Sequence, residues 1–574
     1  MLKKQVTEEL SLSGRHWRMV PVSGPLTGLE MPAPIATVLA QRGHTGAKLR
    51  DFLAPNYHQS LHDPFLLGGM RQGAEAIHRA IEDHDLIGIH GDYDADGLTA
   101  TALLADLLRL LGAKLELIVP DRYQDGYGIS EGTIARTRAV GVKTLVTVDC
   151  GISNRQEISS LMTNDVAVVV TDHHQPPAEL PEATALINPR LPGDPYPNKQ
   201  LAGVGVAFKL AQALLRTSQL TGTEQEKAEK WLLDLVAIGT VADLMPLTGE
   251  NRTLVKYGLT VLRHGRRPGV AALASSAGIE LAQIDTEAIG FRLAPRINAA
   301  GRMGSPQAAL ETLTASTPTA AAAGARVLSE ANTSRQVATT QAINEVLTAI
   351  GEPRPDDRVI IAEGPWKSGI VGLIAGKLVG QYHRPAIVIE VAGDEARGSA
   401  RSIPGFDITA AIRSQASLLT TFGGHASAGG FALPVGNLPS FRKGLTEYVC
   451  SRLSPADLVP ALTIDMALTA ADLTIELVEG LSVLEPTGTG NLKPIFLITG
   501  TVEACRTVGR DNAHIKLDLR LRDGRRLDAI GFGLGGIIAH LPVGAPVEVA
   551  GRPMMNGFKG NRSVEWQVED VRLR

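Results

Sequence analysis

The stretch LIGIHGDYDADGLTATALL, residues 86–104, begins as an apolar strand and ends as an apolar helix. His90, Asp92, Asp94 and Asp96 are crowded between these two apolar segments. A strand that is apolar throughout is typical of a parallel sheet with helices on both faces. Because ligands bind at the carboxyl edge of such a sheet, the stretch predicts an α/β fold with a polar site at that edge.

Similar β-branched runs recur as far as about residue 245 and alternate with amphipathic helical segments. They are KLELIVPD at residues 114–121, TLVTVDCG at 144–151 and VAVVVTDHH at 166–174. Each run ends in polar residues. This alternation predicts a parallel α/β sheet whose strands all deliver polar side chains to the same edge.

The 574 residues exceed what one hydrophobic core usually contains, so we expect several domains. Apolar residues at helical spacing after Thr317-Pro318 predict a long helix that ends at the proline-rich GEPRPDDR. RVIIAEG and PAIVIEV indicate a smaller α/β unit, and short strands with turns indicate a C-terminal β-barrel. The predicted divisions are an N-terminal region that packs on the core, an α/β domain, a connecting helix, a second α/β domain and a β-barrel, at residues 1–83, 84–316, 317–352, 353–455 and 456–574.

The composition indicates a globular protein without an overall basic field, since 56 Lys and Arg face 60 Asp and Glu. Cys150, Cys450 and Cys505 lie too far apart for a disulfide framework or a Cys-x-x-Cys metal clip. The first residues lack the apolar core of a secretory signal, and no apolar run is long enough to span a bilayer. We therefore expect a cytoplasmic protein with no membrane association.

Acidic and histidine residues follow the other predicted strands as well. Asp149 follows TLVTV, Asp172-His173-His174 follow VAVVV, and Asp243 follows the apolar part of LVAIGTVADLMPL, which we read as a fourth strand exit. A lone Asp here is usually a turn or helix-cap residue, and a lone His pair is usually a hydrogen-bonded loop. Repetition at four exits favours a metal site instead, because clustered carboxylates repel one another unless a cation or protons intervene.

Asp and His ligands without sulfur favour Mn²⁺ or Mg²⁺, and they leave Zn²⁺, Co²⁺ and Fe²⁺ open. Two ions about 3.5–4 Å apart, sharing one carboxylate, would generate hydroxide and hold a phosphoryl group for in-line displacement.

Four motifs, HGDYDADG, TVDCGIS, VVVTDHH and TVADLMPL, resemble in this order the motifs of the DHH phosphoesterase superfamily. VPDRYQDGYGIS, LAGVGVAF, APRINAAGRMG and LEPTGTGNLKPIF narrow the resemblance to the RecJ family of single-strand-specific 5′→3′ exonucleases. FGGHASAGGF resembles the glycine-rich signature of the DHHA1 domain. The resemblance runs from about residue 50 to the end of the chain and implies a DHH domain, a DHHA1 domain and an OB-fold barrel.

The resemblance also implies a catalytic centre with two Mn²⁺ or Mg²⁺ ions. Its implied ligands are Asp94, Asp96, Asp149, His173 and Asp243. Asp149 would bridge the ions, and His174 would contact the scissile phosphate or support the transition-state charge. Some relatives have a ligand at the position of His90, but RecJ-like chains vary there, so its role is left open.

Substrate residues follow from the same resemblance. In RecJ-like proteins arginines grip the terminal 5′ phosphate, for which a bidentate guanidinium is well suited. The matching positions are Arg122, Arg302, and Ser399 with Arg401, although a lone arginine is more often a surface ion pair. His425, within the glycine-rich signature, would also bind substrate.

An OB fold binds single strands through a charged groove and aromatic platforms. Residues 506–526 hold seven Lys and Arg against three Asp, which fits the electrostatic half of that requirement. Phe532, Phe558 and Trp566 are the candidate aromatic residues, and each could equally belong to the core.

The function implied is a metal-dependent exonuclease that hydrolyses single-stranded DNA 5′→3′ to mononucleotides in DNA repair and recombination. One alternative is a phosphodiesterase of oligoribonucleotides or cyclic dinucleotides, whose members generally lack the extra β domain. Another is a catalytically silent nucleic-acid-binding relative. Because the chain has no ATP-binding phosphate loop, a helicase and a single-strand-binding protein are its candidate partners, and we expect it to act as a monomer.

Overall fold

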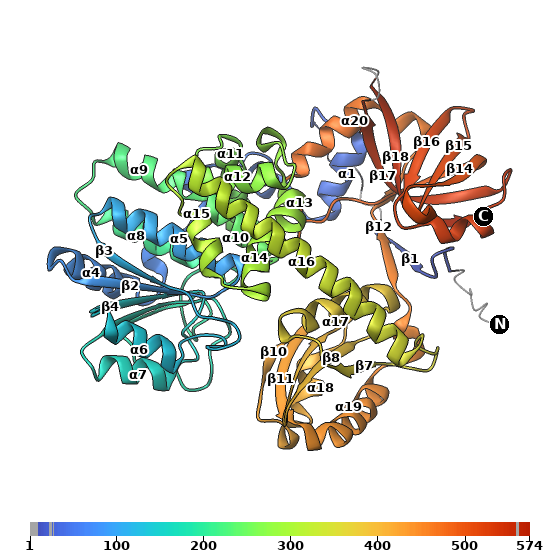
Figure 1. The fold of residues 1–574 in the computed structure, drawn as a ribbon. Coiled ribbons are helices and arrows are strands. Elements are labelled where there is room, and N and C mark those ends of the chain that lie inside the picture. Colours follow the sequence, from blue (N-terminus) through green and yellow to red (C-terminus); the bar gives the residue numbers. More distant parts are fainter. Residues whose placement is uncertain (1–9, 22–23, 25, 27, 558–561) are drawn as a thin grey trace. The chain divides into compact units, whose positions relative to one another are not determined.

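The computed structural model describes residues 10–21, 24, 26, 28–557 and 562–574 (Figure 1). The chain divides into two compact units. The central unit consists of residues 55–344 and 486–492. The remaining described residues, which flank these in the sequence, form the flanking unit.

The central unit has a parallel sheet of order β3-β2-β4-β5-β6. Its strands are β2 Leu86–Gly91, β3 Lys114–Ile118, β4 Thr144–Val148, β5 Ala167–Thr171 and β6 Ala185–Ile187. The four strands predicted between residues 86 and 171 are confirmed, whereas the one predicted before Asp243 is absent. The short β6 was not predicted.

Most helices of the structure lie in the central unit. They are α3 Tyr57–Ser60, α4 Met70–Glu82, α5 Ala95–Leu110, α6 Glu131–Ala139, α7 Arg155–Met162, α8 Gly203–Arg216, α9 Gly222–Trp231, α10 Leu233–Ala242, α11 Gly249–Arg263, α12 Pro268–Ser276, α13 Thr286–Ala288, a π-helix Ile289–Leu293, α14 Ala294–Met303 and α15 Gln307–Leu313. The long helix expected after Thr317 is α16, Pro318–Ile350, which runs on into the flanking unit.

Side chains of the sheet strands alternate between two apolar clusters. Val146 and Val148 of β4 pack on the side of α4, α5 and α8, whereas Leu145 packs on the side of α6 and α7. Figure 1 shows α6 and α7 on one side of this sheet and α5 and α8 on the other. Both faces are thus covered, as the continuously apolar strands predicted.

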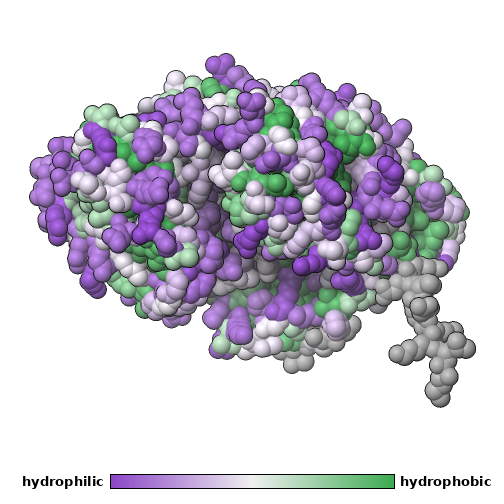
Figure 2. All heavy atoms as spheres, turned by 90° about the horizontal axis from the view of Figure 1, so that it is seen from below, coloured by the Kyte–Doolittle hydropathy of each residue, from purple (hydrophilic) through white to green (hydrophobic). Residues whose placement is uncertain are grey.

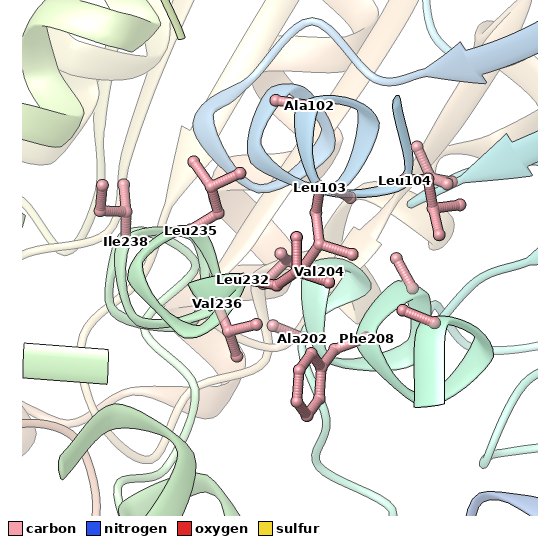
Figure 3. Packing of buried hydrophobic residues seen from close by; sticks show 14 of the residues in the cluster. Ala102, Leu103, Leu104, Ala202, Val204, Phe208, Leu232, Leu235, Val236 and Ile238 are labelled. Carbon is pink, nitrogen blue, oxygen red and sulfur yellow. The ribbon is translucent and has the colours of Figure 1, made fainter. Parts of the chain in front are cut away.

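Helices α5, α8 and α10 pack against one another through fully buried residues (Figure 3). Leu103 of α5, Val204 of α8 and Leu235 of α10 are inaccessible to solvent. Truncating a buried leucine of this kind to alanine costs about 2–5 kcal/mol. This packing fixes the amino ends of α5 and α8 and the carboxyl end of α10, where the polar residues of interest lie.

The flanking unit contains a mixed sheet of order β10-β11-β9-β8-β7. Its elements are β7 Ile360–Gly364, α17 Ser368–Tyr382, β8 Ala386–Ala392, β9 Glu395–Arg401, α18 Ile408–Arg413, β10 Thr421–His425, β11 Ala428–Pro434 and α19 Leu438–Arg452. FGGHASAGGF forms the hairpin of β10 and β11. The predicted smaller α/β unit is therefore present.

A closed β-barrel forms the other part of the flanking unit, as predicted, because β14 pairs with both β15 and β17. Its strands are β14 Phe496–Val508, β15 His514–Leu521, β16 Arg526–Gly531, β17 Pro546–Asn556 and β18 Ser563–Leu573, preceded by β12 Ala461–Ile464, β13 Met466–Ala467 and α20 Ile475–Gly480.

The N-terminal region, predicted as one segment over residues 1–83, is divided between the two units at Ala54. Before that point lie β1 His16–Met19, α1 Ala33–Gln41 and α2 Gly46–Leu53. Strand β1 pairs with β12, and Ile35 and Phe52 join the apolar core of the barrel.

Polar and apolar residues are interspersed on the face of the molecule shown in Figure 2. Of the helices in the described part of the chain, none is both long and apolar enough to cross a membrane.

Candidate metal centre

The acidic and histidine side chains from separate elements do meet in the central unit. Three sets have ligand atoms within 4.8 Å of one another and could hold a metal ion: Asp149, His173 and His174; Asp96, His173 and Asp243; and Asp92, Asp94 and Asp149. They come from the ends of β2, β4 and β5 and from α5 and α10.

His173 lies at the middle of this cluster. Its Nε2 is 3.1 Å from Asp149 Oδ1, 3.7 Å from Asp243 Oδ2 and 3.9 Å from Asp96 Oδ2. His173, Asp149 and Asp96 are buried, and Asp243 is partly exposed. Carboxylates that share one imidazole at these distances form a preformed set of oxygen and nitrogen ligands.

The expectation that Asp243 follows a strand is wrong. Asp243 is the residue that ends helix α10, and its backbone N–H donates to Gly239 O. The segment LVAIGTVA is apolar on all sides because it is buried among other helices. A short run of this kind cannot be assigned to strand or helix from its periodicity.

Asp96 is held by the amino end of α8. Gly203 N donates to Asp96 Oδ2 at 2.7 Å and Val204 N donates to Oδ1 at 2.8 Å. These first N–H groups of a helix have no partner within it and suit a carboxylate. A Cβ on Gly203 would lie 2.5 Å from Asp149 Oδ1, so only glycine allows α8 to approach both carboxylates. This contact explains the first glycine of LAGVGVAF.

Asp149 adopts a left-handed backbone conformation, with φ of +61°. Its N–H donates to Thr171 O, on the neighbouring strand β5, at 3.0 Å. Asp149 is therefore the first residue after β4, and the chain leaves the sheet there. Aspartate tolerates this region better than most residues, and such conformations cluster at functional sites.

Asp94 caps α5 by accepting hydrogen bonds from Asp96 N and Gly97 N at 2.9 and 3.1 Å. Asp94 is therefore a helix cap, as a lone aspartate after a strand usually is, and it is also a member of the acidic cluster. Asp92, which was not among the predicted ligands, also joins a metal-competent set. Its place in DYDAD was a signal that could have indicated this.

The cluster is electrostatically unfavourable without a counter-charge. Burial and the charge of Asp94 raise the pKa of Asp96 to about 7, and burial and the charge of Asp96 raise the pKa of Asp243 to about 8. Burial likewise raises the pKa of Asp149 well above its ordinary range. Asp149 Oδ1 and Asp243 Oδ2 are buried and accept no hydrogen bond from the described residues. Such acceptors fit a cation.

The two histidines are in opposite electrostatic states. Burial lowers the pKa of His173 to about 3, so its ring is neutral and suited to a metal. Burial also opposes charge on His174, but the hydrogen bond of its Nδ1 to Asp172 Oδ1, at 2.8 Å, and the charges of the surrounding aspartates together outweigh burial and raise the pKa to about 9. Tyr127 OH lies 3.0 Å from the same Nδ1. The sequence analysis had counted Asp172 among the strand-exit residues but had not predicted that Asp172 and Tyr127 would hold His174.

His90 stands apart from these sets. It is fully buried, with Nε2 at 3.2 Å from Gly128 O, and burial lowers its pKa to about 4. It belongs to none of the metal-competent sets found among the described residues.

Known proteins resemble this chain over nearly all its length. The DHH family N-terminal domain matches residues 86–240, the DHHA1 domain matches 356–450 and the RecJ OB domain matches 464–570. The single-stranded-DNA-specific exonuclease RecJ of Dickeya dadantii is 35% identical over 94% of this chain and 96% of its own. The chain belongs to the RecJ family. Crystal structures of RecJ from Thermus thermophilus in complex with Mn²⁺ and with Mg²⁺ match with TM-scores of 0.83 and 0.78, at 30% and 29% identity, over 97% of this chain and 79% and 78% of theirs.

The substrate residues that the RecJ resemblance implied fall into two groups, one in each unit. In the central unit, Arg122 lies over the ring of Tyr93, 4.6 Å from its centre, and the backbone oxygen of Arg302 accepts a hydrogen bond from Tyr123. Burial raises the pKa of Tyr93, and the positive charges of Arg122 and Arg302 partly oppose this effect. Both guanidinium groups therefore lie near the Tyr93 side chain.

In the flanking unit, Ser399 and Arg401 lie on β9, where Arg401 Nη1 donates to Ser399 Oγ at 3.1 Å. Arg401 is paired across the sheet with Ala428, which is paired in turn with His425. The sheet thus brings these three predicted residues into one neighbourhood.

The RecJ-like motif LEPTGTGNLKPIF contributes a loop, residues 486–492, to the central unit. Leu247 N donates to Thr489 O at 2.7 Å, and the buried Arg252 donates to the first carbonyl of the loop at 3.0 Å. The loop is therefore anchored to the chain that follows Asp243.

The positive segment of the RecJ-like barrel is partly neutralised. Arg520 and Arg526 both pair with Glu503, and Lys516 lies 3.9 Å from Glu565. These glutamates lie on other strands of the barrel, β14 and β18, and were not visible in a local count of charge. Phe532 is exposed, Trp566 is fully buried in the core, and Phe558 lies outside the described residues.

Proposed function

We propose that this chain is a metal-dependent exonuclease that hydrolyses single-stranded DNA in the 5′→3′ direction to mononucleotides. The observation that carries the proposal is the cluster of buried and partly buried carboxylates and imidazoles that includes His173, in a member of the RecJ family. The closed barrel, matched by the RecJ OB domain, supports a nucleic-acid polymer as the substrate.

We assign Asp94, Asp96, Asp149, His173 and Asp243 as the ligands of two Mn²⁺ or Mg²⁺ ions, the metals present in the Thermus thermophilus structures. When bound, such ions supply a hydroxide nucleophile at neutral pH and stabilise charge on the phosphoryl oxygens. The unpaired oxygens of Asp149 and Asp243 and the neutral ring of His173 support this assignment.

His174 has a separate role as a fixed positive charge. Asp172 and Tyr127 hold its Nδ1, and its raised pKa keeps the ring protonated at neutral pH. A positioned cation stabilises negative charge that develops on the phosphate in the transition state. The ring is partly exposed, so it remains accessible to substrate.

The test of the function is digestion of 5′-phosphorylated single strands, duplex DNA and dinucleotides by the purified chain with Mn²⁺. We expect mononucleotides from the single strand and no digestion of the duplex. Faster hydrolysis of dinucleotides than of long strands would favour the small-substrate phosphodiesterase. Binding without hydrolysis would favour a silent relative.

We propose that Arg401 and Ser399 bind the terminal 5′ phosphate, and that Arg122, Arg302 and His425 contact the strand. Replacing Arg401 with alanine should reduce kcat/KM on 5′-phosphorylated strands by roughly ten-fold or more, the scale of losing a charge-assisted pair. The reduction should be smaller on 5′-hydroxyl strands. Arg397, which lies on the same strand, pairs with Glu395 and is not among the predicted substrate residues, provides the matched control. Equal losses on both kinds of end would contradict the assignment.

The 486–492 loop is expected to position Asp243. Gly490 has φ of +73°, and a Cβ there would lie 3.1 Å from Pro246 Cβ. The Gly490→Ala variant should lose about 1 kcal/mol of stability or more and need more Mn²⁺ for half-maximal activity. Gly544→Ala, at φ of +87° with open space around it, shares the backbone strain but should leave the Mn²⁺ requirement unchanged. Equal requirements in both variants would exclude the positioning role.

We propose a cytoplasmic monomer that acts in DNA repair and recombination, with a helicase and a single-strand-binding protein as partners. The sequence has no phosphate loop for ATP, so strand separation requires another protein.

A further inference from the structure

Three large apolar side chains of the central unit are more exposed than any other in the described part of the chain. They are Phe291, Leu244 and Leu492, with 79%, 71% and 69% of their surface accessible. A single exposed apolar residue needs no explanation, but a group of them indicates a binding surface.

All three border the chain around Asp243. Leu244 follows Asp243 directly and has φ of +56°. Gly290, which precedes Phe291, packs on Val241, because a Cβ there would lie 3.7 Å from Val241 Cγ1. Leu492 ends the loop that is anchored to the chain just after Asp243. All three side chains therefore belong to segments that are joined to residues 241–247, the part of the chain that carries Asp243.

Phe291 is turned outward by its helix. It lies in the π-helix Ile289–Leu293, where Ile289 and Leu293 are buried in the core. The residue midway between two buried positions of a helical turn faces solvent. π-helical turns are rare and frequently occur at functional sites.

Two arginines, Arg292 and Arg296, follow Phe291 in the π-helix and in the first turn of α14. Arg292 donates to the backbone oxygens of Ala277 and Gly278, and Arg296 Nη1 donates to Arg292 O at 2.7 Å. Neither forms an ion pair with a carboxylate of the described residues. Their positive charges are therefore available to a polyanion.

We propose that Phe291, Leu244 and Leu492, with Arg292 and Arg296, form a platform for single-stranded nucleic acid beside the metal centre. The bases stack on the apolar side chains and the guanidinium groups contact the phosphates. An exposed aromatic ring in the same helical segment as two arginines that have no carboxylate partner among the described residues is a combination suited to single strands without sequence preference. The proposal rests on the proposed function, since it extends the same substrate path.

The test compares binding of a long 5′-phosphorylated oligothymidylate with binding of a dinucleotide, by fluorescence anisotropy in EDTA so that no cleavage occurs. Phe291→Ala should raise the Kd for the long strand about five-fold or more, the lower end of what losing one base–aromatic stack costs. The rise should be smaller for the dinucleotide, and Phe291→Tyr should retain affinity. Arg296→Gln should reduce the slope of log Kd against log salt concentration by about one.

The matched control is Leu110→Ala. Leu110 is also exposed, and it ends α5 about 20 Å along the helix axis from Asp96. If Phe291→Ala and Arg296→Gln bind the long strand as Leu110→Ala does, the platform is excluded and the surface is left for a protein partner. If the unaltered chain has no nuclease activity, the proposed function is refuted instead. The two failures can be distinguished because binding is measured in EDTA and does not depend on cleavage.

Discussion

Replacement of Asp149 by asparagine should lower kcat on single-stranded DNA by on the order of 10³-fold or more, at or above the loss seen when one charge-stabilising group is removed. Asp149 belongs to two of the three metal-competent sets, and its Oδ1 is 3.1 Å from His173 Nε2. The amide has almost the same shape as the carboxylate but lacks the charge that a shared metal ligand needs. The rate is measured with saturating Mn²⁺ on a 5′-labelled strand.

A matched control separates this effect from backbone strain. Asp165 has φ of +57°, close to that of Asp149, but it is exposed and belongs to none of the metal-competent sets of the described residues. The Asp165→Asn variant should keep its activity. In the absence of metal, Asp149→Asn should also melt at a higher temperature than the unaltered chain, because one buried like charge has been removed. A fully active Asp149→Asn variant would refute the assignment.

The second large effect is on stability. In metal-free protein the free energy of unfolding should fall by several kcal/mol as pH rises from about 4 to about 8. The pKa values of Asp96 and Asp243 are raised to about 7 and about 8 in the folded state, so folding favours their protonated forms. The pKa of His174 is raised to about 9, so this residue stabilises the folded state at low pH. That stabilisation is also lost as the pH rises, between about 6.5 and about 9. His173 opposes the trend only below about pH 6.5, where unfolding would allow it to protonate.

Mn²⁺ should reverse this trend, because it binds the deprotonated carboxylates. The increase in melting temperature on adding Mn²⁺ is therefore expected to be larger at about pH 8 than at about pH 5. Asp243→Asn should reduce both the pH dependence of the metal-free protein and the effect of Mn²⁺. An equal effect of Mn²⁺ at the two pH values would show that these carboxylates do not bind it.

The sequence predicted the sheet and most of the acidic cluster because both depend on local patterns. Each strand carries its own apolar run, and parallel strands must end at one edge, so Asp96, Asp149 and His173 could be expected to meet. Asp243 was expected at the same site for a wrong reason. Its helix is apolar all round because neighbouring helices bury it, and nothing within the run reveals that.

Features that depend on distant segments could not be predicted. The contact of Gly203 with Asp149 joins α8 to the end of β4, and the pairing of Arg520 with Glu503 joins two strands of the barrel. The exposure of Phe291 depends on a π-helical turn, for which no sequence pattern was recognised. The division of the N-terminal region at Ala54 depends on packing with the barrel, which lies at the other end of the sequence.

The central claim is that carboxylates and imidazoles from separate elements hold catalytic cations. The most direct test is anomalous diffraction from a crystal of the protein soaked in Mn²⁺. We expect two peaks within the cluster, both next to Asp149, with His173 and Asp243 around them. Peaks only elsewhere on the protein, or none in a preparation that is active with Mn²⁺, would contradict the account.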